Sequence, residues 1–155
     1  MIGRDMVLTG DEAVSVARAV AIAAHKGQTD RAGEEYFWHP FAVAMKVSGD
    51  WVAECVAYLH DVLEDTSLTA DDLRLMGFME CVVRPVEMLT HQRNLNYYDY
   101  IRRLADDPIA RKVKLADLEH NTDPSRADSL PLGKAGKYEW AKAYLGQFEP
   151  QIDFD

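Results

Sequence analysis

Apolar residues recur at intervals of three and four along nearly the whole chain, which is the spacing of amphipathic helices. The sequence has no sustained alternation of apolar and polar residues, and no Asn-Gly or Asp-Gly pair joins two apolar runs. β-Hairpins usually show at least one of these signals. The pattern therefore predicts an all-α fold.

Start and stop residues divide this pattern into about seven to eight helices. Thr9 with Glu12 forms a possible capping box, Asn96 is a suitable N-cap, and Pro40 and Pro108 fit first helical turns. Pro85 is expected to kink its helix or to mark a new start. The expected helices cover approximately residues 11–26, 41–47, 51–64, 73–76 (with a weaker capping box of Thr69 and Asp72), 79–90, 97–105, 107–121 and 134–148, and residues 122–133 are expected to form a loop.

Length and composition predict one compact domain over residues 1–155. The chain is 48% hydrophobic and 28% charged, as in ordinary globular proteins, and no linker or repeat divides it. No apolar run approaches the roughly 20 residues of a membrane span. Residues 1–12 lack an apolar segment of signal-peptide length, so we expect a cytoplasmic protein with Cys55 and Cys81 reduced and in the core.

The formal net charge of −9 argues against a protein that coats DNA or an anionic membrane, because both require a positive surface. An anionic substrate remains possible if a metal or a local basic patch supplies the opposite charge. Residues 101–114 hold five basic and two acidic residues. Lys26, Arg31, Arg111 and Lys114 are therefore candidate contacts of a polyphosphate, although each fits a solvated helix face equally well.

The segment AYLHDVLEDT places four ionisable residues at the end of the most apolar stretch. Glu64 follows His60 by four residues and Asp65 follows Asp61 by four, so each pair is expected one helical turn apart. Three carboxylates so close together repel one another unless a cation lies among them. A divalent metal site is one interpretation, and the solvated end of a helix is the other.

Two further polar residues interrupt apolar helical surfaces. Asp117 lies among apolar residues in VKLADLEHN, and a buried carboxylate needs a metal, an arginine or a helix cap as partner. His39 stands at the start of a helix after two aromatic residues, where either a metal ligand or an ordinary loop histidine is possible. If His39, His60, Asp61 and Asp117 converge from three helices, they make one metal site.

These segments, in this order, resemble the HD-domain metal-dependent phosphohydrolases. They are most similar to the hydrolase domain of the RelA/SpoT enzymes and to its small stand-alone relatives. The similarity extends over residues 16–121. Residues 21–40, AIAAHKGQTDRAGEEYFWHP, resemble the AHxGQ…SGExYxxHP entry of that subgroup at His25, Gly27, Gln28, Gly33, Glu34, Tyr36, His39 and Pro40.

The resemblance implies a metal-dependent hydrolase that removes the 3′-pyrophosphate of (p)ppGpp. It implies one divalent metal ion, for which Mn²⁺ is the preferred candidate and Zn²⁺, Fe²⁺, Ni²⁺ or Mg²⁺ are alternatives. The implied metal ligands are His39, His60, Asp61 and Asp117, with Glu64 and Asp65 near the attacking water and Asn121 on the nucleotide.

The chain differs from the long RelA/SpoT enzymes, called the long enzymes below, at two positions that the resemblance implies contact the nucleotide. It reads Thr29-Asp30-Arg31 after the Gly-Gln pair, where they have two basic residues, and Asp123-Pro124 after Asn121, where they have Arg and Thr. The substrate therefore stays open between (p)ppGpp and another phosphorylated nucleotide, such as an ordinary nucleotide, an NADPH-like cofactor or a pyrophosphorylated tRNA. A non-catalytic nucleotide-binding module is the third possibility.

The remaining candidates are aromatic. Tyr97 precedes the basic stretch and is a candidate for stacking on a base, although tyrosines at helical spacing more often pack half-buried. His91 and His120 are expected to be structural, and His25 to support the metal or its loop. The sequence indicates no particular oligomeric state.

Overall fold

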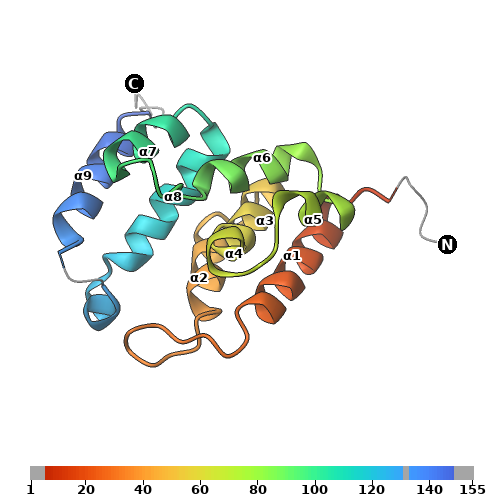
Figure 1. The fold of residues 1–155 in the computed structure, drawn as a ribbon, viewed down its shortest axis with the longest axis horizontal. Helices are drawn as coiled ribbons and strands as arrows, with labels where there is room; N and C mark the ends of the chain where they lie inside the picture. Colours follow the sequence, from red (N-terminus) through yellow and green to blue (C-terminus); the bar gives the residue numbers. More distant parts are fainter. Residues whose placement is uncertain (1–5, 131–132, 149–155) are drawn as a thin grey trace, which may run out of the picture.

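The computed structural model describes residues 6–130 and 133–148, and over these residues the all-α class is confirmed (Figure 1). Within them, the β pairing consists of two isolated bridges, Leu8 with Phe78 and Thr29 with Glu35. The ends of the expected domain, residues 1–5 and 149–155, lie outside the described part. The elements are α1 (Gly10–Ala24), α2 (Trp38–Lys46), α3 (Trp51–Leu59), α4 (Val62–Asp65), α5 (Ala70–Leu75), α6 (Glu80–Leu89), α7 (Tyr97–Leu104), α8 (Pro108–Asn121), the 3₁₀ helix η1 (Pro124–Ser129) and α9 (Ala135–Gly146).

Helix α3 is the centre of the fold, with α1 on one side of it and α8 on the other (Figure 1). Six of its nine residues are buried, and it packs against α1, α2, α6 and α8. A helix that is apolar on most faces can satisfy them only by being surrounded. The chain therefore leaves its hydrophobic centre at the C-terminal end of α3, where His60 follows.

The expected helix over 51–64 is interrupted, and this is a correction to the sequence prediction. Helix α3 ends at Leu59, and α4 begins at Val62. The His60 ring donates a hydrogen bond through Nδ1 to the carbonyl oxygen of Ala57, 2.6 Å away. In a continuous helix that oxygen would accept from the backbone N–H of Asp61. The His60 side chain therefore replaces the backbone donor at the Ala57 carbonyl. Because α3 and α4 are separate, the described residues form nine α helices.

Two of the three proposed helix caps are confirmed, at Asn96 and Thr69, and Asp107 caps α8 in addition. The Asn96 side chain accepts a hydrogen bond from the backbone of Asp99, and Asp107 accepts two from the first turn of α8. Thr69 forms the expected capping box with Asp72. The proposed box at Thr9 is wrong, because its side chain makes no capping hydrogen bond.

Pro40 and Pro85 both lie within helices in the structure, although the sequence suggested helix boundaries there. Helix α2 begins at Trp38 rather than at residue 41, so Pro40 lies within its first turn, where no intrahelical donor is lost. Helix α6 continues through Pro85 instead of restarting there. The expected loop over 122–133 contains η1, and its residues 131–132 lie outside the described part.

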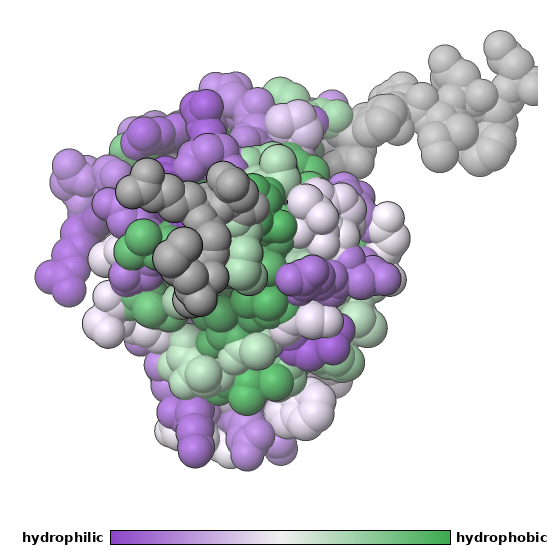
Figure 2. Space-filling model, turned by 90° about the vertical axis from the view of Figure 1, so that its right-hand side faces the viewer, coloured by the Kyte–Doolittle hydropathy of each residue, from purple (hydrophilic) through white to green (hydrophobic). Residues whose placement is uncertain are grey.

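The surface carries several large apolar side chains. Figure 2 shows the face at the α1–α5 end of the molecule, where apolar residues gather among polar ones. Cys81 is exposed rather than in the core, whereas Cys55 is buried as expected, and both are free thiols. Along the described segments, none of the helices has the length and apolar character that crossing a bilayer requires.

Leu59 and Leu75 provide a matched test of where the core lies. Leu59 is fully buried at the end of α3, whereas Leu75 is 86% exposed. Leu59→Ala is expected to lower the free energy of unfolding by about 2–5 kcal/mol, because it removes packed methyl groups and leaves a cavity. Leu75→Ala should change it by less than about 0.5 kcal/mol. Urea denaturation followed by circular dichroism measures both, and equal losses would contradict the central position of α3.

Candidate metal centre and its pocket

Three buried side chains from separate elements meet at one point. His39 comes from α2, His60 follows α3 and Asp117 lies in α8, and one ligand atom from each lies within 4.8 Å of the others. His39 Nε2 is 2.7 Å from Asp117 Oδ1, and His60 Nε2 is 3.3 Å from the same oxygen. The convergence expected from the sequence therefore occurs for these three residues.

Asp61 borders this group. Its Oδ2 lies 3.1 Å from His60 Nε2 and 3.9 Å from His39 Nε2. The same oxygen accepts a hydrogen bond of 2.6 Å from the Tyr36 hydroxyl, which fixes its direction. Burial by itself raises the pKa of Asp61, but the neighbouring His60 imidazole outweighs burial and holds that pKa below its ordinary value.

The nitrogen that His60 directs into the group has no hydrogen-bond partner. His60 uses Nδ1–H on the Ala57 carbonyl, so the lone pair of the neutral ring is on Nε2, and this atom is buried and without a hydrogen-bond partner among the described residues. A buried polar atom without a partner is costly. Two imidazole nitrogens with carboxylate oxygens beside them fit a divalent transition ion such as Mn²⁺, Fe²⁺ or Zn²⁺.

Helix α8 supplies the partners that keep Asp117 ionised. Its Oδ2 accepts from Lys114 Nζ at 2.9 Å, and its Oδ1 accepts from Asn121 Nδ2 at 3.1 Å. Burial alone would raise the pKa of Asp117, but the Lys114 ammonium and the bond from His39 hold it well below its ordinary value. Burial likewise opposes the charge of Lys114, and the Asp117 carboxylate raises the pKa of Lys114 well above its ordinary value.

A polar cavity of about 200 Å³ opens beside these groups. It is lined by several of the predicted residues and by His91, Lys134 and Tyr138, to which the sequence analysis gave no role in a site. Lys134 and Tyr138 lie at the start of α9, which packs on α8. No motif in the sequence indicated that α9 reaches the site. The predicted residues on its wall are His60, Asp61, Glu64, Tyr97, Lys114, Asp117 and Asn121.

The two acidic residues of α4 have different surroundings. Glu64 lines the cavity and accepts a hydrogen bond from the backbone N–H of His91, and burial raises its pKa. Asp65 is absent from the cavity wall. Its carbonyl accepts from the Gln28 side chain, and burial together with the Asp61 carboxylate raises the pKa of Asp65 to about 6.

A second cavity, of about 280 Å³, lies next to the first and is lined by residues 29–31. The two share Tyr36, Asn121 and Tyr138 on their walls. Arg31 and Arg126 both line this second cavity, and Arg126 Nη1 lies 3.6 Å from Asp30 Oδ2. Arg126 is not among the residues predicted from the sequence.

Two of the expected substrate contacts, Arg111 and Lys26, lie away from these cavities. Arg111 donates to the carbonyl oxygen of Ala105 at 2.6 Å and lies over the Phe148 ring. It belongs to the first turn of α8, whereas Asp117 and Asn121 lie near the other end of the helix. Lys26 lines a separate, more apolar pocket of about 620 Å³. Neither residue lines the two cavities beside the metal centre.

Two further histidines, His120 and His25, contact residues of the site. His120 Nδ1 lies 2.7 Å from His39 Nδ1 and the two rings stack, so His120 touches the metal group directly. Burial and the nearby His39 lower the pKa of His120 to about 4. His25 hydrogen-bonds Gln28, and its ring lies 4.9 Å from that of Tyr36, in the supporting position expected of it.

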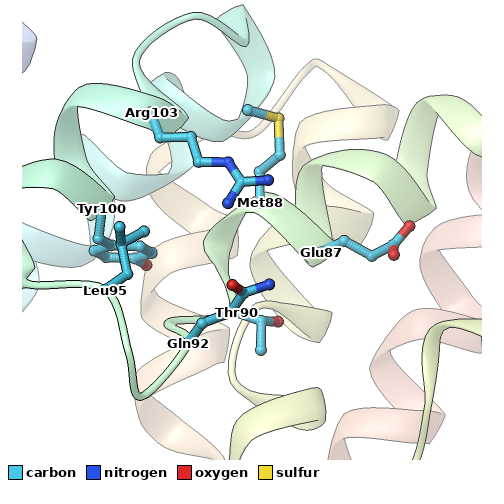
Figure 3. A pocket seen from close by; sticks show the side chains of 7 residues that line it. All are labelled: Glu87, Met88, Thr90, Gln92, Leu95, Tyr100 and Arg103. Carbon is cyan, nitrogen blue, oxygen red and sulfur yellow. The ribbon is translucent and has the colours of Figure 1, made fainter.

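Another pocket lies between α6 and α7, with a volume of about 140 Å³ (Figure 3). Figure 3 shows Arg103 and Tyr100 approaching from α7 and Glu87 pointing away along α6. Its wall holds a single carboxylate and no histidine or cysteine, so it offers no set of metal ligands. The candidate metal ligands therefore lie at the cavity beside Asp117 and not at this pocket. The lining residues are Glu87, Met88, Thr90, Gln92, Leu95, Tyr100 and Arg103.

The curated proteins similar to this chain include hydrolases of guanosine-3′,5′-bis(diphosphate). The mouse guanosine-3′,5′-bis(diphosphate) 3′-pyrophosphohydrolase MESH1 is 34% identical over 126 residues, which are 72% of this chain and 70% of MESH1. The bifunctional (p)ppGpp synthase/hydrolase SpoT of Escherichia coli K12 is 34% identical over 116 residues, which are 66% of this chain and 16% of SpoT. The chain thus spans about a sixth of the long relatives that it matches. No protein-family profile matches it.

The fold is also similar to a solved structure. A protein described as a metazoan ortholog of SpoT that hydrolyzes ppGpp superposes with a TM-score of 0.61, over 91% of this chain and 97% of that one. The two sequences are 20% identical, so this likeness concerns the fold.

The unpartnered Nε2 of His60 leads to a prediction for metal binding. Mn²⁺ at 100 times its dissociation constant is expected to stabilise the wild-type protein by about 2.7 kcal/mol, because an ion that binds only the native state adds its binding free energy. His60→Ala should abolish the rise in Tm, and Arg111→Ala should keep it. Thermal unfolding with and without Mn²⁺ measures the shift, and an undiminished shift in His60→Ala would place the ion elsewhere.

Proposed function

The chain belongs to the family of guanosine-3′,5′-bis(diphosphate) 3′-pyrophosphohydrolases that includes MESH1 and SpoT, and we propose that it is a metal-dependent hydrolase of (p)ppGpp. The observation that carries the proposal is the convergence of His39, His60 and Asp117. His60 and Asp117 line a polar cavity together with Asp61, and His39 lines the adjacent one. The substrate on this proposal is a small phosphorylated nucleotide.

The proposed ligands are His39 Nε2, His60 Nε2, Asp61 Oδ2 and Asp117 Oδ1. A divalent ion held there supplies a Lewis acid that activates water and polarises a phosphoryl oxygen. We propose Mn²⁺, on the resemblance of the motifs and on the mixed nitrogen and oxygen donors, which also suit Fe²⁺ and Zn²⁺. Tyr36 orients Asp61 through its hydroxyl, so the carboxylate is already directed when an ion arrives.

Glu64 is the proposed general base. It lines the cavity, it is held by the backbone N–H of His91, and burial raises its pKa, which strengthens it as a proton acceptor. It takes the proton of the attacking water as oxygen bonds to phosphorus. The bond between phosphorus and the 3′ oxygen breaks, the 3′ oxygen gains a proton, and pyrophosphate leaves. We also propose a catalytic role for Asp65, which supports the proton transfer to Glu64 although its side chain does not line the cavity.

The remaining cavity groups fit phosphate and nucleoside. Lys114 and Asn121 already bond Asp117, and both line the cavity, so they offer N–H groups to a phosphoryl oxygen next to the metal ligands. Tyr97 and Tyr138 provide aromatic surface on the same wall. Arg31, on the adjoining cavity, is the proposed contact of the far phosphates or the base.

A second candidate function is hydrolysis of a different phosphorylated nucleotide. Asp30 replaces a basic residue of the long enzymes, and its Oδ1 accepts from the backbone N–H groups of Ala32 and Glu34. Asp123 likewise accepts from the backbone of Ser125 at the start of η1. Both substitutions shape the local chain, so the nucleoside end of the cavity differs from that implied by the resemblance while the metal end does not.

A substrate panel decides between the candidates. The purified protein with Mn²⁺ is incubated with ppGpp, pppGpp, GTP, ATP and NADPH, and pyrophosphate and orthophosphate are measured separately. We expect pyrophosphate release from ppGpp and pppGpp, with the 5′ phosphates retained. Release of orthophosphate from the other nucleotides would favour the second candidate, and binding without any release would reject a hydrolase.

Glu64 and His60 should fail in different ways. Glu64→Gln removes the base but no proposed ligand, so it is expected to keep Mn²⁺ affinity and to lower kcat by roughly 10²–10⁴-fold. His60→Ala should lose both Mn²⁺ binding and turnover. Arg111→Ala, which lies away from the cavity, serves as the control with unchanged kcat and KM. Steady-state kinetics with equilibrium dialysis of Mn²⁺ separates these effects, and normal turnover in Glu64→Gln would remove it from the mechanism.

A further inference from the structure

His39 and His120 contact each other through like atoms. Their Nδ1 nitrogens are 2.7 Å apart, and the rings stack with centroids 5.0 Å apart and an angle of 18° between planes. A contact this short is a hydrogen bond, and it requires one nitrogen to donate and the other to accept. A neutral imidazole carries one N–H and one lone pair, so the role of each ring is set by its other nitrogen.

The other nitrogen of His39 belongs to the metal group. Without an ion, His39 Nε2 donates a hydrogen bond to Asp117 Oδ1, 2.7 Å away, and Asp61 Oδ2 lies 3.9 Å from the same nitrogen, so an ion bound there replaces the Nε2 proton. A ring that binds a metal through Nε2 offers its lone pair there, and its single proton must then be on Nδ1. That proton points at His120, so His120 Nδ1 must accept it.

We propose that His120 is a positioning residue that accepts the Nδ1 proton of His39 and so fixes the ring with Nε2 free for the metal. The proposal rests on the metal site of the proposed function. It assigns to His120 the tautomer with its proton on Nε2. Both ligand histidines then carry their proton on Nδ1 and direct Nε2 at the metal, but their Nδ1 protons have different acceptors. His60 donates its Nδ1 proton to a backbone carbonyl, and His39 donates to a side chain.

The position of His120 on α8 supports this role. Asp117 and His120 are three residues apart, on neighbouring positions of one helix face. Lys114 lies one turn before Asp117 and bonds its Oδ2, and Asn121 lies one turn after it and bonds its Oδ1. One helix thus holds a ligand, two groups that orient that ligand, and the acceptor that orients a ligand from α2.

Metal affinity tests the proposal with matched variants. His120→Phe keeps a stacked ring but has no acceptor, and it is expected to weaken Zn²⁺ and Mn²⁺ binding by roughly 10–100-fold, the usual effect of removing a partner of a ligand histidine. His120→Gln restores an acceptor through its amide oxygen and should recover most of the affinity. Glu119→Gln, on the exposed neighbouring residue, should bind as the wild type does.

Isothermal titration of the full chain with each ion measures the affinities, and circular dichroism checks that each variant is folded. Equal affinity of His120→Phe and wild type would overturn the proposal. Failure of His120→Gln to recover affinity, in a folded protein, would reduce His120 to a packing role and would overturn it as well.

The wild-type protein gives a second, independent readout. Nitrogen-15 NMR of histidine side chains in the Zn²⁺-loaded protein should show His120 with an unprotonated Nδ1 and a protonated Nε2, and His39 with a protonated Nδ1. A protonated Nδ1 on His120 would overturn the proposal even if no variant folds. Absence of Zn²⁺ binding would overturn it together with the metal site.

This test is separable from the hydrolase proposal. If Zn²⁺ binds, the tautomers are as assigned and ppGpp is not cleaved, the role of His120 stands and the proposed substrate falls. If ppGpp is cleaved and the tautomers are reversed, the proposed function stands and the role of His120 falls.

Discussion

A single buried carboxylate, that of Asp117, determines how the helices can meet. It has one oxygen on His39 Nε2 and Asn121, the other on Lys114, and the unpartnered His60 nitrogen 3.3 Å away. A charge in a protein interior is tolerated only when several groups satisfy it. Elements α2, α3 and α8 therefore cannot shift relative to one another without leaving Asp117 unsatisfied, and the same constraint brings the proposed metal ligands together.

The break between α3 and α4 is the second requirement of this arrangement. A continuous helix would have left the Ala57 carbonyl bonded to the backbone, and His60 Nδ1 would have lacked its acceptor. By ending α3 at Leu59, the chain gives His60 a fixed ring and turns Asp61 toward Tyr36. The bond from His60 Nδ1 to the Ala57 carbonyl replaces the backbone bond that is lost. The break in the helix therefore serves to position the side chains of the site.

The sequence predicted the helices and the convergence of His39, His60 and Asp117, because both follow from local patterns: apolar spacing, caps and polar residues on apolar faces. It missed the break after Leu59, since helix propensity carries no information on a side chain that competes for a carbonyl. It also missed Tyr138, Lys134 and the role of His120. These depend on how α9 and α2 pack against α8, and no spacing along the chain encodes that. Nor did the sequence indicate that Arg111 lies away from the cavities, because charge alone does not say which end of α8 faces them.

The charges around the cavities explain how an acidic protein can bind a polyanion. The chain as a whole carries a formal charge of −9, yet the two adjacent cavities are lined by four basic residues, Arg31, Lys114, Arg126 and Lys134, and by four acidic ones, Asp30, Asp61, Glu64 and Asp117. The walls are thus balanced before any ion binds, and Lys114 and Arg126 face carboxylates rather than open solvent. A divalent cation at His39, His60 and Asp117 would make the site net positive by two charges. Binding of a phosphorylated nucleotide then depends on the ion, as its hydrolysis does. Metal loading is therefore expected to raise substrate affinity as well as turnover.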